Sequence, residues 1–414
     1  MVGNSYDCIV IGAGPAGSCC AALVAEAGLR TLLVERDKMP RFHVGESLMP
    51  ETFWTLDRLG VLNEMKQIGF TRKNGVQFVQ TADDETPPFY FDEHAEHESA
   101  VTFHVQRAEF DKLLFDTALK RGATITDETT VVDVEFKKNG SHLVSLKTVD
   151  GKTKQVATKI VVDASGQQSL IANRNQLKEV NPHLKKAAIW AYFKNAIVNG
   201  GCNPEVTCVL HTKSKEAWFW YVPLSDETVS VGLVGDSDFI LKRGGSPQQT
   251  FNTEVGNCPG LQRRLRDAQP VGKFYVAKDF SYTTTQASGA GWVLIGDAYG
   301  YIDPVFCSGV FLALKSGELA ADAIIDSFYR NDFSAESLGR WADKFEDGVQ
   351  WIRKLVQCFY DKDFSFSEFM QAHPEHAGKL TALFAGKVFE GNPGAIFDDL
   401  DPWLENLKGA NALT

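Results

Sequence analysis

A glycine-rich stretch near the N-terminus has the residue types and spacing that bind the pyrophosphate of a dinucleotide. Gly12, Gly14 and Gly17 form a G-x-G-x-x-G pattern between a predicted strand and a predicted helix. The first glycine permits a tight turn, the second lets a phosphate approach the backbone, and the third lets the helix pack close to the strand. Glu35 ends the next predicted strand, where an acid can bind a ribose diol. The motif alone leaves NAD and FAD open.

A second glycine-rich region between residues 296 and 309 favours FAD. Gly296 and Asp297 follow a predicted short strand, and Ser308 and Gly309 lead into a long predicted helix. Asp297 could accept a hydrogen bond from a ribityl hydroxyl, and the backbone N–H groups of Ser308 and Gly309 could face the edge of the flavin ring. A second glycine-rich entry to a helix can hold another part of an extended cofactor, so the two regions together indicate FAD.

Two further positions could serve the same cofactor. Asp163 and Gly166 form a D-x-x-G turn after a predicted buried strand, although the residues alone indicate only a turn. Arg107 begins a predicted helix, where its guanidinium could reach a phosphate or the flavin. An exposed arginine in an ion pair is the other interpretation of Arg107, and the spacing leaves both open.

Three motifs follow one another along the chain: the G-x-G-x-x-G at 12–17, the D-x-x-G at 163–166 and the Gly296-Asp297 segment. Together they make the chain resemble the flavoprotein monooxygenases of the p-hydroxybenzoate hydroxylase type. The resemblance implies an α/β fold of the glutathione-reductase and p-hydroxybenzoate-hydroxylase-like kind, which is α+β with a Rossmann-type FAD-binding domain. It also implies a β-sheet substrate lobe and a C-terminal helical region. FAD, and not NAD, is then the tightly held cofactor.

Within that superfamily the chain is similar to the flavin-dependent halogenases of the phenol- and pyrrole-acting branch. Gly45-Glu46-Ser47 resembles a segment that they carry beside the flavin, and Lys73 resembles the lysine that their chemistry requires. The run Trp218-Phe219-Trp220-Tyr221-Val222-Pro223 is similar to their W-x-W-x-I-P signature, with valine in the isoleucine position. Residues 303–310 are similar to their D-P-V-F-S-S-G-V run, with Cys307 in place of the first serine. That departure leaves the affinity for halide open.

The resemblance implies an FADH2-dependent enzyme that uses O2 and chloride or bromide to halogenate a phenolic or pyrrolic substrate, either free or tethered to a carrier protein. Lys73 would hold hypohalous acid, and the backbone N–H groups of Ser308 and Gly309 would bind the halide. The resemblance also implies that a separate flavin reductase supplies reduced FAD. The sequence has no second G-x-G-x-x-G that would indicate a nicotinamide domain, although hydroxylases of the same fold also lack one. The residues that would separate the flavin from the substrate are Trp218, Trp220 and Pro223.

These residues also have ordinary interpretations. Trp218 and Trp220 alternate along a predicted strand and lie on one face, as two core residues would. An isolated lysine such as Lys73 is more often solvated. The alternative functions on the same fold are an FAD-dependent aromatic monooxygenase and a prenyl or geranylgeranyl reductase-like oxidoreductase. A flavin-binding protein without enzymatic activity is a third.

The flavin site implied by the resemblance draws on residues from the whole first 310 positions. Asp279 is included because it could reach the flavin edge, although a turn aspartate is the other interpretation. The predicted FAD-binding residues are Gly12, Gly14, Ala16, Gly17, Glu35, Arg36, Gly45, Glu46, Ser47, Arg107, Val131, Asp163, Gly166, Asp279, Asp297, Pro304, Gly309 and Val310.

The elements that must position these residues alternate along the chain, which predicts interleaved lobes. A strand over 6–11, a helix over 18–27 and a strand over 31–35 form a βαβ unit. A strand-rich section follows over 186–234, and helices are predicted over 310–329 and 336–360. We expect a discontinuous FAD-binding domain (1–78, 100–185 and 275–330), a β-rich substrate lobe (79–99 and 186–274) and a helical C-terminal region (331–414).

Composition excludes several classes of protein. The 414 residues are 44% hydrophobic and 23% charged, as in ordinary globular enzymes, and the net charge of -11 disfavours a nucleic-acid partner. Eight cysteines stand without a C-x-x-C pair or a zinc-like spacing, so no metal site is expected. No apolar run reaches the length of about 18 residues that a membrane span needs. A cytoplasmic location is therefore expected.

Overall fold

The first of two large sheets carries the predicted dinucleotide motif. The computed structural model describes residues 5–79, 87–197, 203–242 and 244–411. β1 (Ser5–Ile11) pairs in parallel with β2 (Thr31–Val34) and β10 (Thr153–Asp163). The sheet continues to β7 beyond β2 and to β17 and β16 beyond β10, while β8 and β9 form a meander on β10. The ranges are β7 Thr124–Thr126, β8 Thr129–Glu135, β9 His142–Thr148, β16 Ser288–Gly289 and β17 Trp292–Leu294.

The βαβ unit forms as predicted, and its glycines explain why. An added Cβ at Gly17 would overlap the carbonyl oxygen of Gly12, so only glycine lets α1 (Pro15–Glu26) approach β1 this closely. Gly12 itself has a φ of +99°, a conformation that favours glycine. The helix begins at Pro15, earlier than predicted, because proline fits the first helical position. The small residues of α1 are buried against α9 (Ser308–Arg330) and α4 (Arg107–Lys120).

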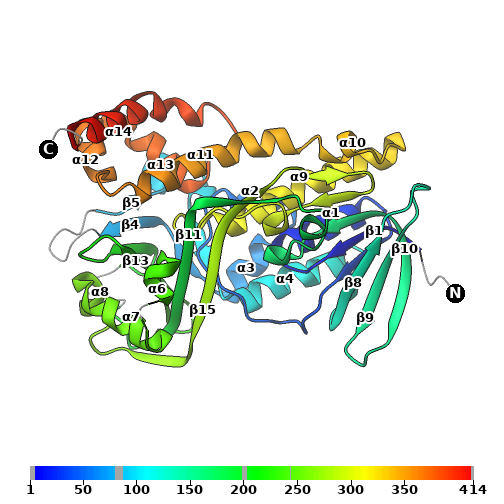
Figure 1. Ribbon diagram of the computed structural model, residues 1–414, viewed down its shortest axis with the longest axis horizontal. Helices are drawn as coiled ribbons and strands as arrows, with labels where there is room; N and C mark the ends of the chain where they lie inside the picture. Colours follow the sequence, from blue (N-terminus) through cyan, green and yellow to red (C-terminus); the bar gives the residue numbers. More distant parts are fainter. Residues whose placement is uncertain (1–4, 80–86, 198–202, 243, 412–414) are drawn as a thin grey trace.

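The second sheet has seven strands in the order β15-β11-β14-β13-β12-β4-β5. Two long antiparallel strands, β11 and β15, lie side by side at one edge and are the longest strands in Figure 1. Most pairs are antiparallel, but β12 and β4 are parallel. The ranges are β4 Gly75–Val79, β5 Phe89–Tyr90, β11 Lys178–Lys194, β12 Val206–His211, β13 Ala217–Pro223, β14 Val229–Asp236 and β15 Gln269–Thr284.

Several elements of this lobe differ from expectation. β11 begins eight residues before the predicted start at 186, and β15 was not predicted, because exposed edge residues such as Val271 and Val276 break the alternation of apolar and polar positions. Three short helices were also missed, and they bury apolar residues of the loop after β14 against the sheet, with Phe251 packing on Phe219. Their ranges are α6 Ser237–Leu241, α7 Pro247–Gly256 and α8 Pro259–Arg264.

The C-terminal region is helical, as predicted, and lies above both sheets in the orientation of Figure 1. The helix predicted over 336–360 is divided into α10 (Ala335–Gly339) and α11 (Ala342–Tyr360). α12 (Phe366–Ala372), α13 (Ala377–Ala385) and α14 (Phe397–Asn411) follow. The remaining ranges are α2 Thr52–Arg58, α3 Leu62–Ile68, β3 Thr71–Lys73, β6 Thr102–His104 and α5 Leu170–Arg174.

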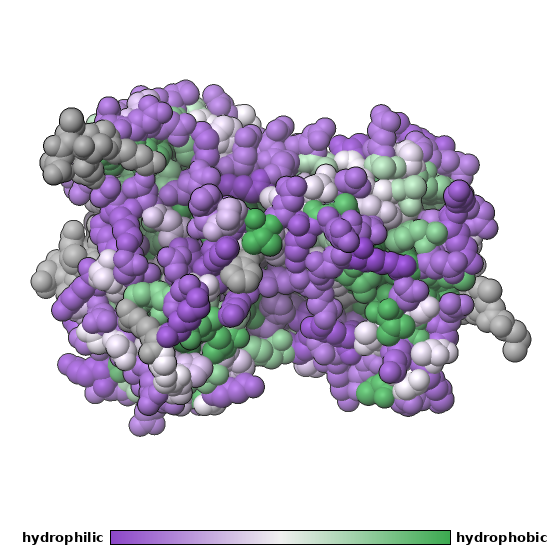
Figure 2. All heavy atoms as spheres, in the orientation of Figure 1, coloured by the Kyte–Doolittle hydropathy of each residue, from purple (hydrophilic) through white to green (hydrophobic). Residues whose placement is uncertain are grey.

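The architecture is the predicted α/β fold with a second sheet and a helical C-terminal region. The division into three lobes stays a prediction in its exact boundaries, and β4 pairs within the second sheet. Figure 2 shows a mostly hydrophilic face with hydrophobic side chains in separate patches. Among the described residues, no helix is both long and apolar enough to span a membrane.

Candidate active site

A large cavity of about 540 Å³ brings most of the predicted FAD-binding residues together. It extends from the carboxyl ends of β1, β2 and β10 to the second sheet, the place where ligands bind in open α/β sheets. The predicted residues that line it are Gly12, Gly14, Ala16, Glu35, Arg36, Gly45, Glu46, Ser47, Arg107, Val131, Gly166, Trp218, Trp220, Asp297, Pro304, Gly309 and Val310.

The glycine-rich end of the cavity fits a dinucleotide. A Cβ added to Gly14 would meet one neighbouring atom, the Arg41 guanidinium nitrogen at 3.6 Å, so the space beside this backbone belongs to the cavity. Glu35 is 4% exposed, and its carboxylate accepts a hydrogen bond from the Ala13 backbone N–H at 2.8 Å. The acid therefore also fixes the turn, a role that the sequence did not indicate.

Arg107 is buried, and its interpretation as an exposed arginine is wrong. Its guanidinium forms two hydrogen bonds with Asp111, at 2.8 and 3.1 Å, and one with the Val44 carbonyl at 2.7 Å. Since its charge is balanced by Asp111 within α4, Arg107 mainly holds the Val44-Gly45 backbone against the cavity. Asp111 was not predicted as a site residue, although it pairs with both Arg107 and Arg41, the latter at 3.0 Å.

Glu46 and Ser47 follow this backbone segment and lie at the cavity in a buried polar network. The hydroxyl of Tyr192 donates to Glu46 at 2.6 Å. Burial raises the pKa of the Glu46 carboxyl, although this hydrogen bond acts in the opposite direction. Ser47 contacts the Thr207 hydroxyl at 2.8 Å, and the same hydroxyl lies 2.8 Å from Nε2 of His104. Sequence reasoning missed Tyr192, Thr207 and His104, because no local motif marks them.

The two predicted tryptophans both face the large cavity, and Trp218 also lines a second one. Their rings are 6.5 Å apart. Trp220 packs flat over Gly232 of β14, where any Cβ would overlap the indole, and its Nε1 donates to Ser230 at 3.1 Å. Trp218 is 2% exposed and its Nε1 donates to Tyr360 at 3.1 Å. The contact between Trp220 and Gly232 could not be predicted from the sequence alone, because it depends on how β13 and β14 pair.

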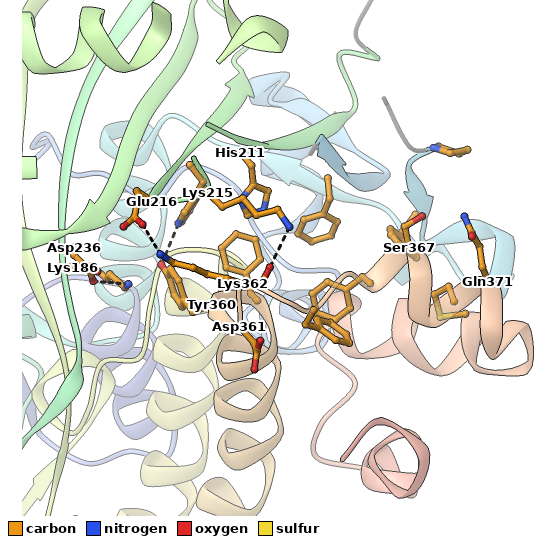
Figure 3. Close-up of a pocket in the computed structure, with 18 residues that line it drawn as sticks. Lys186, His211, Lys215, Glu216, Asp236, Tyr360, Asp361, Lys362, Ser367 and Gln371 are labelled. Carbon is orange, nitrogen blue, oxygen red and sulfur yellow. Dashed lines mark hydrogen bonds and ion pairs between the residues drawn. The ribbon is translucent and has the colours of Figure 1, made fainter. Parts of the chain in front are cut away.

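The second cavity, of about 310 Å³, shares Trp218 with the large one, and Figure 3 shows the residues that line it. Its apolar walls come from β4, β5, β13, α11, α12 and the segment between these two helices. Charged pairs lie at its rim: Lys186 binds Asp236 at 2.8 Å, and Lys362 pairs with Glu216. Lys186 also lies 3.8 Å from the centre of the Tyr360 ring. The aromatic and apolar lining residues are Phe78, Pro87, Phe89, Trp218, Phe359, Tyr360, Phe364, Phe366 and Met370.

Lys73 is a buried lysine, and its interpretation as a solvated side chain is wrong. It is 3% exposed at the end of β3, and its Nζ donates to the Leu48 carbonyl at 2.7 Å. Burial lowers the pKa of Lys73, while the nearby Cys307 opposes this shift. Lys73 is not among the described residues that line either cavity, whereas its neighbour Cys307 lines the larger one. The amine is therefore desolvated close to the cavity wall.

The segment before α9 supplies backbone donors at the large cavity. Cys307 caps α9 with a φ of +57°, and Gly309 has open space where a Cβ would stand. Ser308 is buried and lines a small neighbouring pocket instead of the large cavity. A carboxylate oxygen of Asp303 accepts the N–H of Val305 at 3.0 Å, which fixes this turn.

Other predicted site residues have structural positions outside the large cavity. Asp163 is fully buried and accepts the N–H groups of Ser165 at 3.0 Å and Ile171 at 2.7 Å. Gly17 lets α1 pack against the turn at Gly12. The carbonyl of Pro223 lies 3.0 Å from Nδ1 of His104, so this residue contacts the buried polar network. The backbone of Asp279 pairs with Lys186 in β15, and its side chain lies outside the described part of the structure.

Comparison with known proteins decides the family. Residues 7–100 and 91–385 match the tryptophan halogenase family. The chain belongs to this family. This halogenase is 31% identical to a 1H-pyrrole-2-carbonyl-[peptidyl-carrier protein] brominase of Pseudoalteromonas luteoviolacea, over 94% of this chain and 93% of that protein. It is 28% identical to the corresponding chlorinase of Pseudomonas fluorescens, over 97% and 93%.

Solved structures agree with this assignment. A flavin-dependent brominase superposes with a TM-score of 0.85 at 27% identity, covering 97% of this halogenase and 100% of that chain. The myxobacterial chondrochloren halogenase, an FAD-dependent enzyme, gives 0.79 at 28% identity, covering 95% and 92%. The protein is a flavin-dependent halogenating enzyme that uses FAD, a halide and O2. This excludes the monooxygenase and prenyl reductase alternatives, and the large cavity fits FAD.

Proposed function

We propose that this halogenase acts on a small phenolic or pyrrolic ring that reaches the second cavity on a carrier protein. The two pyrrole-2-carbonyl relatives act on carrier-bound substrates and match nearly the full chain. The observation that carries the proposal is the position of Trp218, which lines both cavities. One indole thus separates a space that fits FAD from a largely apolar space of about 310 Å³, which is large enough for an aromatic ring.

Separation of the two spaces suits halogenation better than hydroxylation. Bound reduced FAD, with O2, supplies the oxidising power that turns halide into hypohalous acid. The wall at Trp218 keeps the ring away from the flavin cavity, and the tight packing of Trp220 on Gly232 keeps that wall rigid. A mobile halogen species can cross where an aromatic ring cannot.

Lys73 is the proposed holder of that species. An amine with a lowered pKa, fixed by the Leu48 carbonyl, can hydrogen-bond hypohalous acid or form a haloamine with it. The ring carbon then takes the halogen, the ring proton leaves, and the hydroxyl of the acid departs as water. The N–H groups of Ser308 and Gly309, at the start of the 23-residue α9, are the proposed halide donors.

The enzyme works in the cytoplasm with a transient protein partner. A separate flavin reductase supplies reduced FAD, as the resemblance to flavin-dependent halogenases implies, and the single G-x-G-x-x-G of the sequence is consistent with this. Six cysteines in the described part of the chain are free thiols, which supports a cytoplasmic location: Cys8, Cys19, Cys20, Cys258, Cys307 and Cys358.

Mass spectrometry of reaction products tests the function. The enzyme is incubated with enzymatically reduced FAD, O2, bromide and three substrate sets: carrier-bound pyrrole-2-carbonyl, free pyrrole-2-carboxylate, and phenols. We expect a bromide-dependent mass gain on the carrier-bound ring. A hydroxylated product that forms without halide would contradict halogenation, and equal turnover of free acid would contradict the carrier.

A further inference from the structure

Four potential metal ligands meet in the C-terminal helical region, outside the lining of both cavities. His373 follows α12, Glu375 and His376 belong to the short 3-10 turn Pro374–His376, and Asp399 is in α14. One ligand atom from each lies within 4.8 Å of the other three. Sequence reasoning expected no metal because it followed the cysteines, and Asp399 is brought to the histidines only by the fold.

The donor types suit a first-row divalent metal ion, and the ligand atoms already lie within 4.8 Å of one another, although the exposed Asp399 carboxylate must move away from His376 to admit an ion. Nε2 of His376 lies 2.7 Å from a carboxylate oxygen of Asp399, and Nδ1 of His373 lies 3.3 Å from one of Glu375. Tetrahedral zinc, with bonds of about 2.0–2.2 Å, needs ligand atoms about 3.3–3.6 Å apart. Two imidazoles and two carboxylates favour zinc over calcium or magnesium, which prefer oxygen ligands alone.

Packing holds both imidazoles in place before any ion binds. Phe369 of α12 stacks on His373, with ring centres 4.9 Å apart, and lies parallel to His376 at 6.1 Å. Trp403 of α14 contacts the His373 ring edge-on at 5.7 Å. The His376 side chain is 4% exposed, whereas the two carboxylates are half exposed. Because the buried histidine is fixed and the carboxylates open to solvent, ligand ordering costs little on binding and the ion can enter.

We propose that His373, Glu375, His376 and Asp399 bind one divalent transition-metal ion, zinc by preference, which joins the end of α12 to α14. The consequence reaches the second cavity, because α12 contributes Phe366, Ser367, Met370 and Gln371 to its lining. The metal therefore stabilises one wall of that cavity. Nδ1 of His376 has no hydrogen-bond partner among the described residues, so the usual support behind a ligating histidine is missing and the site binds less tightly than a closed structural zinc site.

Metal titration of the full chain, with any affinity tag removed, tests the site without flavin or substrate. The chelator-treated protein is titrated with Zn²⁺ by calorimetry and with Co²⁺ by visible absorption. The test variants are Asp399→Asn and His373→Gln, which keep the side-chain size. The matched controls are Asp398→Asn, a neighbouring exposed acid, and His183→Gln, an exposed histidine of β11.

We expect one Zn²⁺ per chain and a four-coordinate Co²⁺ spectrum in the wild type and both controls. Each test variant should weaken Zn²⁺ binding at least about tenfold. At one Zn²⁺ concentration near the wild-type Kd, the thermal midpoint should rise clearly in the wild type and the controls, and much less in Asp399→Asn. No stoichiometric binding in the wild type, or equal binding by wild type and test variants, would overturn the site. Halogenation is measured separately, so its failure would not imitate either result.

Discussion

The indole Nε1 of Trp218 donates a hydrogen bond to the hydroxyl of Tyr360 at 3.1 Å, and this hydroxyl lies 3.0 Å from a carboxylate oxygen of Asp303. The wall between the two cavities is therefore tied to the turn that precedes α9. Burial, together with the Asp303 charge, raises the pKa of Tyr360 well above its ordinary value. The hydroxyl keeps its proton and donates it to Asp303.

Tyr360→Phe should disconnect Trp218 from Asp303. Loss of a buried hydrogen bond to a carboxylate should lower the free energy of unfolding by about 1–3 kcal/mol. FAD binding should persist, but less halogenated product should form per reduced flavin oxidised, because the wall is less well fixed. Product yield and denaturant unfolding measure the two effects. Tyr329→Phe, at a residue 83% exposed, is the matched control. An unchanged yield in Tyr360→Phe would show that the contact has no role in turnover.

Lys73→Met should retain FAD binding and flavin oxidation while halogenation of the substrate falls at least about 100-fold, the scale of losing a positioned catalytic group. Methionine fills the buried space without an amine. Lys73→Arg should not rescue the yield, because guanidinium stays protonated. Lys66→Met, at an exposed lysine, is the control. Product per flavin oxidised is measured, and a wild-type yield in Lys73→Met would remove Lys73 from the mechanism.

His104 should make the enzyme sensitive to acid. Burial and the charge of Lys73 lower the pKa of His104 from 6.5 to about 3 in the folded protein. The unfolded chain then binds a proton below pH 6.5 that the folded protein does not. Stability from this residue is complete above pH 6.5 and falls by about 1.4 kcal/mol per pH unit as the pH drops towards 3.

Urea unfolding of wild type and His104→Gln between pH 7 and pH 4 measures this effect. Glutamine can replace both hydrogen bonds, to the Pro223 carbonyl and from Thr207, but it does not titrate. The stability of the variant should therefore depend less steeply on pH. Parallel pH profiles would show that His104 is not the titrating group.

Gly14→Val should abolish FAD binding while the chain still folds. The new side chain would project beside Arg41 into the large cavity, where the cofactor's pyrophosphate is expected. Flavin fluorescence titration gives the affinity, and the thermal midpoint without FAD checks folding. Ala27→Val, which adds the same bulk at an exposed position after α1, is the control. Wild-type FAD affinity in Gly14→Val would place the cofactor elsewhere.

Local sequence signals predicted the parts of the site that are built locally. Gly12 and Gly17 predict the βαβ unit because their roles depend on neighbouring backbone, and the order of motifs predicts the cavity as a whole. Thr207 and Asp399 were not predicted, because each acts with residues at least 23 positions away in the sequence. β15 was missed for a similar reason, since its long pairing with β11 compensates for its weak local pattern.

The close packing of Trp220 on Gly232 restricts which substitutions can accumulate at these two positions during evolution. Any side chain at position 232 would displace the indole, so the two positions cannot enlarge independently. A lineage that reshaped this wall would have to shrink the residue at 220 before, or together with, the loss of glycine at 232. The width of the large cavity beside Trp220 is therefore set jointly by residues 220 and 232.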